Sequence, residues 1–184
     1  VGARCIKISK ALGLYIDDPT VKDDTRLLRI DHERLDPIWE TAGRLGLPIF
    51  IHTGDPKAFF EPLTPENERY DELSVHPDWS FYGPDFPSRR ALLEARNRVF
   101  KRFANTTFVA VHFANNPENI NEVDRLLDRY PNVVVDIAAR VPELGRHAPS
   151  HVRKVFTKHQ DRILLGTDLG FSPRQIMLGS VGRD

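Results

Sequence analysis

The hydrophobic pattern of the chain alternates between short apolar runs and longer segments with helical spacing. Each apolar run is bounded by turn-forming or polar residues, which is typical of a strand buried in a parallel sheet. The intervening segments place apolar residues three and four positions apart, which is typical of amphipathic helices. Strands are expected at residues 3–9, 48–53, 107–113, 133–138 and 162–167, and helices at residues 36–45, 88–104, 117–129 and 149–159. This alternation predicts an α/β fold with a parallel sheet.

Capping signals mark the ends of the predicted helices. Asp36 and Pro37 are suited to the start of the first long helix, and Gly46 is suited to its end. Ser88 is expected to cap the next helix, and Pro117 is expected to open the one after it. These signals place the helices between consecutive strands, as a parallel sheet requires.

One segment, residues 55–87, breaks this alternation. Its 33 residues hold six of the 14 prolines and seven aromatic side chains, and eight acidic residues against two basic ones leave a net charge of −6. A loop of this length in a compact domain is usually functional or disordered. Disordered linkers are poor in aromatic residues, so the composition favours an ordered, packed lid.

The overall composition excludes several classes of protein. The 184 residues carry 26 basic and 26 acidic side chains, which argues against a nucleic-acid partner, because phosphate binding requires a net basic surface. No apolar stretch approaches the roughly 18 residues of a membrane span. The single cysteine, Cys5, excludes a disulfide framework and is expected to be a small buried residue of the first strand. This composition is compatible with a cytoplasmic protein that acts on a small molecule and can form homo-oligomers.

Side chains of metal-ligand type stand near the carboxyl ends of four predicted strands. They are His52, His112, Asp136 and Asp168. The carboxyl ends of parallel strands meet at one edge of the sheet, where the active sites of α/β proteins lie. Imidazole and carboxylate groups are suitable ligands for Zn²⁺, Mn²⁺ or Fe²⁺. A lone strand histidine is more often a hydrogen-bonded core residue, so the residues alone leave a metal site and a structural role equally open.

Four motifs in one order give the chain a family resemblance. They are Pro48–Gly54 (PIFIHTG), Val111–Asn116 (VHFANN), Tyr130–Ile137 (YPNVVVDI) and Arg162–Asp168 (RILLGTD), with further similar segments at Leu35–Glu40, Glu94–Arg98 and Ala139–Arg146. With these motifs the chain resembles the amidohydrolase superfamily. The similarity is to the amidohydrolase-related branch, which includes aminocarboxymuconate-semialdehyde decarboxylase and metal-dependent hydrolases of the TIM-barrel fold. The resemblance implies a (β/α)8 barrel.

The resemblance also implies roles for individual residues. His52 would be a metal ligand at the end of barrel strand 5, and His112, on strand 6, would be a ligand or a group that polarises the substrate. Asp168, at the end of strand 8, would be a ligand and a proton shuttle. Arg140 and Glu143 match a motif after strand 7 and would contact substrate or brace the loop. The implied cofactor is a divalent metal, with Zn favoured and Mn or Fe as alternatives.

Two lysines and a tryptophan complete the candidate residues. Lys7 and Lys10 stand at strand 4 of the barrel that the resemblance implies. Some members of the superfamily carry a carboxylated lysine there that bridges two metals, and for Lys7 a barrel-interior or salt-bridged lysine is the alternative reading. Lys10, together with Trp79 of segment 55–87, is a candidate for contacting substrate.

The chain departs from the family pattern at its beginning. The family's His-x-His motif on strand 1 has no counterpart among the seven histidines, the first residue is Val1, and the only methionine is Met177. A complete barrel takes about 250 residues. Residues 1–184 are therefore expected to form one partial barrel domain that supplies strands 4–8.

Three functional hypotheses remain open. The first is a metal-dependent hydrolase in which metal-activated water attacks a C–N or C–O bond of a small molecule, with Asp168 as general acid–base and His112 stabilising the developing oxyanion. The second is non-oxidative decarboxylation of an aromatic or conjugated acid whose carboxylate meets Arg140. The third is a catalytically incomplete fragment or a non-enzymatic binding module, because the ligands of strand 1 are missing.

Overall fold

The computed structural model describes residues 2–18 and 27–169. Within them, five strands form one parallel sheet in the sequential order β1-β2-β3-β4-β5. The strands are β1 (Ile6–Ile8), β2 (Ile49–Ile51), β3 (Phe108–Ala110), β4 (Val133–Asp136) and β5 (Ile163–Leu164). Each lies inside a predicted strand but is shorter than predicted. The segment 107–113, for example, stops pairing at Ala110 because the backbone turns left-handed from His112 onward.

The helices follow the strands in the predicted alternation. They are α1 (Ala11–Leu14), α2 (Asp36–Leu45), α3 (Tyr70–Val75), α4 (Arg89–Arg102), α5 (Val111–Ala114), α6 (Ile120–Arg129), α7 (Val141–Leu144) and α8 (Pro149–Lys158). The end predicted for α2 and the cap predicted for α4 are confirmed, since Gly46 ends α2 with a φ of 64° and Ser88 Oγ accepts from the Ala91 N–H at 3.2 Å. The prediction of Asp36 as N-cap is wrong, because Asp36 is the first helical residue, Leu35 precedes it, and no side chain caps this end of the helix. Helix α6 begins three residues later than predicted, because the cap is the Asn119 side chain rather than Pro117.

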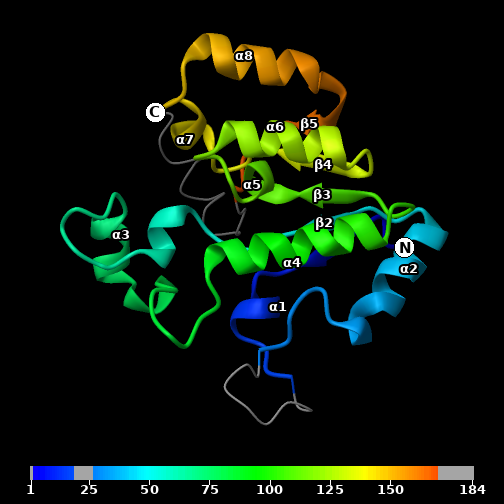
Figure 1. Cartoon of the computed structure of the whole chain (residues 1–184), viewed down its shortest axis with the longest axis horizontal. Helices are drawn as coiled ribbons and strands as arrows, with labels where there is room; N and C mark the ends of the chain where they lie inside the picture. Colours follow the sequence, from blue (N-terminus) through cyan, green and yellow to red (C-terminus); the bar gives the residue numbers. More distant parts are fainter. Residues whose placement is uncertain (1, 19–26, 170–184) are drawn as a thin grey trace, which may run out of the picture.

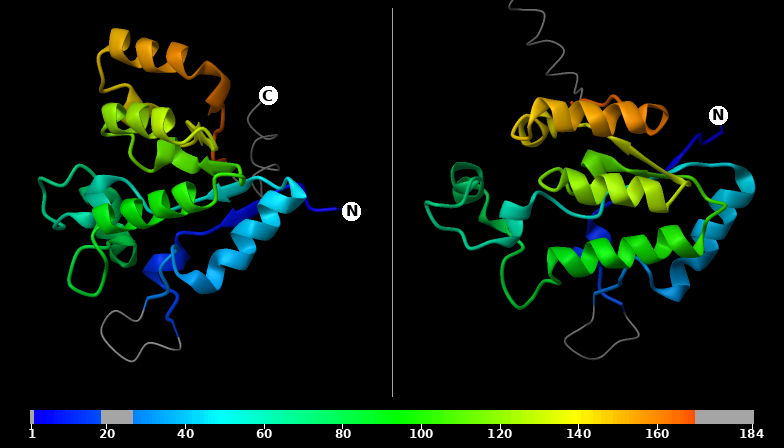
Figure 2. Two further views of the ribbon diagram at one scale, coloured as in Figure 1. Left: turned by 45° about the vertical axis from the view of Figure 1, so that its right-hand side comes forward. Right: turned by 45° about the horizontal axis from the view of Figure 1, so that its top comes forward.

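The long helices form a layer on one face of the sheet. Figure 1 shows α4 and α6 side by side in front of the sheet, and Figure 2 shows α2 and α8 continuing this layer at its two ends. The strand residues that belong to the main hydrophobic core with these helices are Ile49, Ile51, Phe108, Ala110, Val133 and Val135. Side chains alternate along a strand, so Lys7, Phe50 and Val134 face the opposite side, where Lys7 is exposed.

A sequential parallel sheet with its helices on one face is the arrangement of consecutive strands in a (β/α)8 barrel. A doubly wound sheet would instead reverse its strand order and carry helices on both faces. The prediction of a partial (β/α)8 barrel is therefore confirmed. Among the described residues, no helix combines the length and the apolar character needed to cross a membrane.

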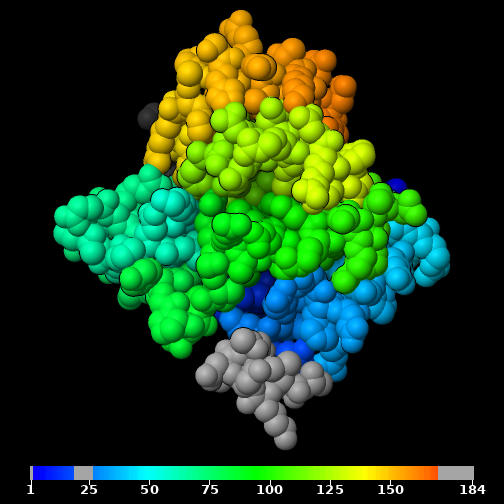
Figure 3. All heavy atoms as spheres, viewed as in Figure 1, coloured from blue at the N-terminus to red at the C-terminus, as the bar shows by residue number. Residues whose placement is uncertain are grey.

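Residues 55–87 fold around a small hydrophobic core of their own. The segment contains helix α3 and two 3-10 turns, Lys57–Phe60 and Pro77–Trp79. Its buried core residues are Phe59, Leu73 and Phe81, which pack with Leu14 and Leu92, and Phe60 and Phe86 lie against them. Figures 1 and 3 show the segment projecting as a lobe from the side of the molecule to which β2 leads. The prediction that the aromatic residues pack holds for these four phenylalanines, whereas Tyr70, Trp79 and Tyr82 are exposed.

The prediction for Cys5 is wrong. Cys5 is exposed and precedes β1, which begins at Ile6. Strand β1 pairs with β2 alone among the described strands, and its ladder starts where Ile6 meets Ile49. Cys5 therefore lies outside the ladder, where neither a second neighbouring strand nor the helical layer covers it.

Candidate functional site

Two histidines meet at the carboxyl edge of the sheet. His52 directly follows β2, His112 comes two residues after β3, and the register of these neighbouring strands pairs Ile51 with Ala110. The centroids of the two imidazole rings lie 4.6 Å apart, with an interplanar angle of 71°. The parallel topology thus brings together two side chains that are distant in the sequence.

The hydrogen bonding of His112 fixes which of its nitrogens has a free lone pair. His112 is 4% exposed, and its Nδ1 lies 2.9 Å from the backbone oxygen of Ala138. A carbonyl oxygen can only accept, so Nδ1 carries the proton and Nε2 keeps its lone pair. Burial lowers the pKa of His112, and the neighbouring His52 and Arg140 act in the same direction against the opposing effects of Ala138 and Asp168. A neutral imidazole held through its other nitrogen by a carbonyl is the usual state of a metal-binding histidine.

His52 and Asp55 form the second part of the cluster. The Nε2 atom of His52 is buried and has no hydrogen-bond partner among the described residues, and Asp55 Oδ1 lies 3.5 Å away. The other oxygen of Asp55 accepts a hydrogen bond from Lys10. Burial opposes ionisation of Asp55. The interactions of its carboxylate with the side chains of His52 and Lys10 outweigh this effect and hold the pKa of Asp55 below its usual range. Asp55 was not predicted, although its position three residues after His52 was a usable signal.

The two candidate aspartates have different surroundings. Asp168 Oδ2 lies 3.9 Å from Nε2 of His112, and the Asp168 side chain is 60% exposed. Asp136 is buried, and its Oδ1 accepts from the backbone N–H groups of His112 at 2.8 Å and of Ala138 at 3.1 Å. Asp168 therefore faces the histidines with an accessible carboxylate, whereas Asp136 holds the backbone that carries His112.

Arg140 and Glu143 lie after β4, at the start of α7 and within it. Arg140 is 8% exposed; its Nη1 donates to the Ala139 oxygen at 2.7 Å, and its Nε has no hydrogen-bond partner in the described part of the chain. Glu143 is 1% exposed and accepts from Arg69 of segment 55–87. Glu143 thus braces this segment, one of the two roles that the sequence left open, while Arg140 keeps an unused donor near His112.

The remaining candidates are placed at different distances from the histidines. Lys10 joins the cluster through its ion pair with Asp55. Lys7 lies on the exposed face of β1, away from the helical layer. Trp79 ends a 3-10 turn in segment 55–87, is 39% exposed and stacks on His76, with ring centroids 4.0 Å apart. Contact of Trp79 with substrate stays a prediction.

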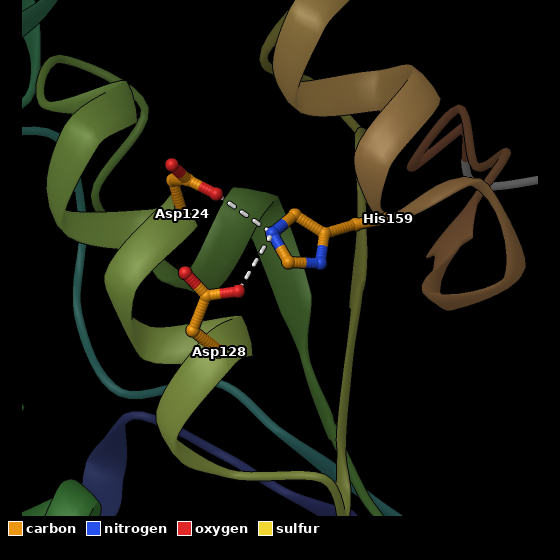
Figure 4. A group of neighbouring side chains, drawn as sticks. All are labelled: Asp124, Asp128 and His159. Carbon is orange, nitrogen blue, oxygen red and sulfur yellow. Dashed lines mark hydrogen bonds and ion pairs between the residues drawn. The ribbon is translucent and has the colours of Figure 1, made fainter.

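A second histidine–carboxylate group lies between helices α6 and α8 (Figure 4). It consists of Asp124 and Asp128 on α6 and of His159, which directly follows α8. Their ligand-type atoms all lie within 4.8 Å of one another. No sequence motif points to His159, which is 4% exposed. Its composition alone would make this group a candidate metal site.

The hydrogen bonds of this second group leave it no free ligand atom on the histidine. Lys158 Nζ lies 2.7 Å from Asp124 Oδ1 and 2.6 Å from Asp128 Oδ2. Arg162 donates to His159 Nδ1 at 3.2 Å, and a guanidinium has no acceptor, so Nδ1 is unprotonated. The Nε2 atom of neutral His159 therefore carries a proton and donates it to Asp124 at 2.7 Å. The group is a closed network that ties α6 to α8.

Comparison with protein families identifies the chain. A sequence profile of the amidohydrolase family matches residues 2–182. The chain belongs to the amidohydrolase family. Members of this family are generally enzymes and usually bind a divalent metal. The resemblance drawn from the four motifs is therefore confirmed, whereas no curated protein matches the chain.

Several solved structures are similar to this amidohydrolase-family chain. An uncharacterised TIM-barrel protein from Bordetella bronchiseptica is 19% identical over 86% of this chain and 54% of its own, with a TM-score of 0.46. An amidohydrolase II is 14% identical over 100% of this chain and 56% of its own, with a TM-score of 0.49. A 2,6-dihydroxybenzoate decarboxylase from Rhizobium is 18% identical over 79% and 47%, with a TM-score of 0.44. The chain spans about half the length of these proteins.

Proposed function

We propose that the carboxyl edge of the sheet carries the metal centre of a hydrolase that cleaves a C–N or C–O bond of a small molecule. One observation carries the proposal: two neighbouring imidazoles each present an Nε2 atom that forms no hydrogen bond within the described residues. A buried polar atom without a partner is unfavourable unless a ligand satisfies it. This argument applies to the buried Nε2 of His52, and the free Nε2 of His112 belongs to the neighbouring ring, so the pair is arranged to receive one ligand.

The donor set fits a divalent metal. Two imidazole nitrogens and the carboxylate of Asp168 are suitable for Zn, with Mn and Fe as alternatives. When bound, such a metal supplies Lewis-acid polarisation of a carbonyl group and activation of water. The His-x-His motif of the family has no counterpart in this sequence, so the proposal covers the part of the centre that this chain carries.

The chain's own residues divide the remaining tasks. Asp168 is exposed beside His112, so it can take a proton from the attacking water and return it to the leaving group. Because His112 turns a lone pair rather than an N–H toward the site, its geometry favours the role of ligand over that of oxyanion donor. Segment 55–87, which Glu143 braces through Arg69, would limit the access of water to this edge.

Arg140 favours a second candidate, non-oxidative decarboxylation of an aromatic or conjugated acid. Its guanidinium is buried close enough to lower the pKa of His112, and it forms no ion pair within the described residues. A buried cation without a carboxylate partner is suited to bind the carboxylate of a substrate. This feature would serve a decarboxylase directly, and it would serve a hydrolase if the hydrolase acts on an acidic substrate.

The test is metal analysis of the purified protein, followed by turnover assays with two panels of compounds. One panel holds esters, amides and lactones, and the other holds hydroxybenzoates and conjugated acids. We expect His52→Ala to lose most of the bound metal and His76→Ala, a change of an exposed histidine, to retain it. Turnover of the first panel supports hydrolysis, and turnover of the second supports decarboxylation with a raised KM in Arg140→Met.

Two outcomes would contradict the proposed enzyme. A wild-type protein that binds no divalent metal would exclude the metal centre. A protein that binds metal through His52 and His112 but turns over neither panel would favour the third hypothesis, an incomplete fragment or a ligand-binding module.

A further inference from the structure

The segment that carries His112, labelled α5 in Figure 1, is not a right-handed helix and has an unusual backbone. Four consecutive residues, His112 to Asn115, have positive φ angles of 58°, 52°, 56° and 50°. None of them is glycine, and L-residues other than glycine seldom adopt this left-handed conformation, least of all in succession. The structure around the turn must therefore hold it in place.

Two side chains hold the two ends of the turn. At its start, Asp136 Oδ1 accepts from the His112 N–H at 2.8 Å. At its end, Asn115 Oδ1 accepts from the Thr53 N–H at 2.9 Å, and Asn115 Nδ2 donates to the Gly54 oxygen at 2.5 Å. Thr53 and Gly54 directly follow His52. The turn therefore sets the position of one histidine and, through Asn115, binds the backbone that follows the other.

Arg96 of α4 holds the middle of the turn. Its side chain is 1% exposed; Nη1 donates to the Ala114 oxygen, while Nε and Nη2 donate to Asn97 Oδ1 at 3.2 and 3.0 Å. No ion pair to Arg96 occurs among the residues that the structure describes. Burial, together with the nearby Arg89, lowers the pKa of Arg96 to about 9. A buried charge without a counter-ion is unfavourable, and its acceptor outside α4 is a carbonyl of the left-handed turn.

We propose that Arg96 is a positioning residue that keeps the turn from His112 to Asn115 left-handed and thereby fixes the spacing of His112 and His52. The hydrogen bond from Arg96 satisfies the Ala114 carbonyl oxygen, which is buried and does not take part in a right-handed helical ladder. The effect on the turn stands on the geometry alone, and the consequence for metal binding rests on the proposed function.

The test combines Arg96→Met with Ala114→Gly. Glycine adopts a positive φ without a steric penalty, so a glycine at position 114 should relieve the need for Arg96. We expect Arg96→Met to lower the affinity for Zn²⁺ on the order of 10- to 100-fold, as for other groups that orient ligands. In the double variant, Ala114→Gly should recover most of the lost Zn²⁺ affinity. The single variant Ala114→Gly should bind Zn²⁺ with an affinity within about twofold of that of the wild type. The matched control is Arg98→Met on the same helix, which removes an exposed arginine paired with Asp31.

A second readout separates this proposal from the proposed function. The Cα and Cβ chemical shifts of residues 113–115 report on the sign of φ without any metal. We expect left-handed shifts in the wild type, their loss in Arg96→Met, and their return at positions 113 and 115 in the double variant. Equal behaviour of Arg96→Met and Arg98→Met would overturn the proposal. The proposal would also be overturned if the double variant did not regain Zn²⁺ affinity and left-handed chemical shifts. The same holds if neither the single nor the double Arg96→Met variant folded, because the effect of the change would then extend beyond the turn.

Discussion

The chain contains two groups of histidine and aspartate side chains, and they differ in how their polar atoms are used. At the carboxyl edge, His52 and His112 each keep an Nε2 atom without a hydrogen bond among the described residues. Between α6 and α8, His159 donates from Nε2 to Asp124 and accepts at Nδ1 from Arg162. The two groups have similar composition, but only the first has histidine Nε2 atoms without a hydrogen bond among the described residues.

This difference shows that residue type is a weak indicator of a metal site. The α6–α8 group has its ligand-type atoms within 4.8 Å of one another, yet Lys158 already forms ion pairs with both carboxylates. In the carboxyl-edge group, His112 Nε2 lies 3.9 Å from Asp168 Oδ2, and His52 Nε2 lies 3.5 Å from Asp55 Oδ1. His112 is held through its opposite ring nitrogen, because Nδ1 donates to the Ala138 oxygen and leaves Nε2 free. Imidazole nitrogens that no hydrogen bond uses, rather than proximity, identify the candidate centre.

The largest effect is expected from removing ligands at the carboxyl edge. The double change His52→Ala and Asp168→Ala should abolish metal retention, because it removes one of the two free imidazoles and the facing carboxylate. Elemental analysis of the purified protein measures this directly. Metal content equal to that of the wild type would refute the assignment of these ligands.

A smaller effect is expected from Asp55→Asn. Asp55 lies 3.5 Å from His52 Nε2 and binds Lys10, so the change keeps the shape but removes the charge beside the histidine. We expect the metal affinity to fall on the order of tenfold, which is typical of groups that support a ligand. Calorimetric titration with Zn²⁺ measures the affinity, and Asp71→Asn, at an exposed position on α3, is the control. An unchanged affinity would remove Asp55 from the centre.

The α6–α8 group should respond in stability and not in metal content. His159→Ala removes the hydrogen bonds to Asp124 and Arg162 from a buried position, and losses of this kind cost about 1–3 kcal/mol. Urea unfolding measures the free energy, and the metal content should equal that of the wild type. A loss of metal in the folded variant would reverse the comparison between the two groups.

The smallest expected effect is the pH dependence of the same group. Burial opposes ionisation of Asp124, but Lys158 and His159 outweigh it and lower the pKa of Asp124 below its usual value of 3.8. A carboxylate with a lowered pKa in the folded state stabilises the fold above its unfolded pKa and loses this contribution as the pH falls through the folded value. Asp124→Asn should therefore reduce the fall in melting temperature between about pH 5 and pH 3. If the melting temperature of Asp124→Asn fell as steeply with pH as that of the wild type, the stability of the network would not depend on the charge of Asp124.

The carboxyl edge was largely predictable from the sequence, because apolar runs fix strand ends. His52 and His112 directly follow or closely follow such runs, and parallel pairing then determines that they meet. Asp168 was predicted on the same ground. Asp55 was missed because its partners, Lys10 and His52, reach it only after the βα units have packed.

Other features could not be read from the sequence pattern. The left-handed turn after β3 contains no glycine, so no residue announced the positive φ angles. The role of Arg96 depends on a carbonyl in another element, 18 positions away. No sequence pattern marks His159, because its partners lie on α6 and in the turn after α8, and only the packing of these elements shows that both ring nitrogens of this buried residue form hydrogen bonds.

The most direct test of the account is one NMR titration of the wild-type protein with Zn²⁺, observed through the imidazole ¹⁵N resonances. The account predicts that the Nε2 resonances of His52 and His112 change on addition of Zn²⁺, while those of His159 keep their positions. A change at His159, with His52 and His112 unaffected, would contradict the claim that free lone pairs at the carboxyl edge form the metal centre.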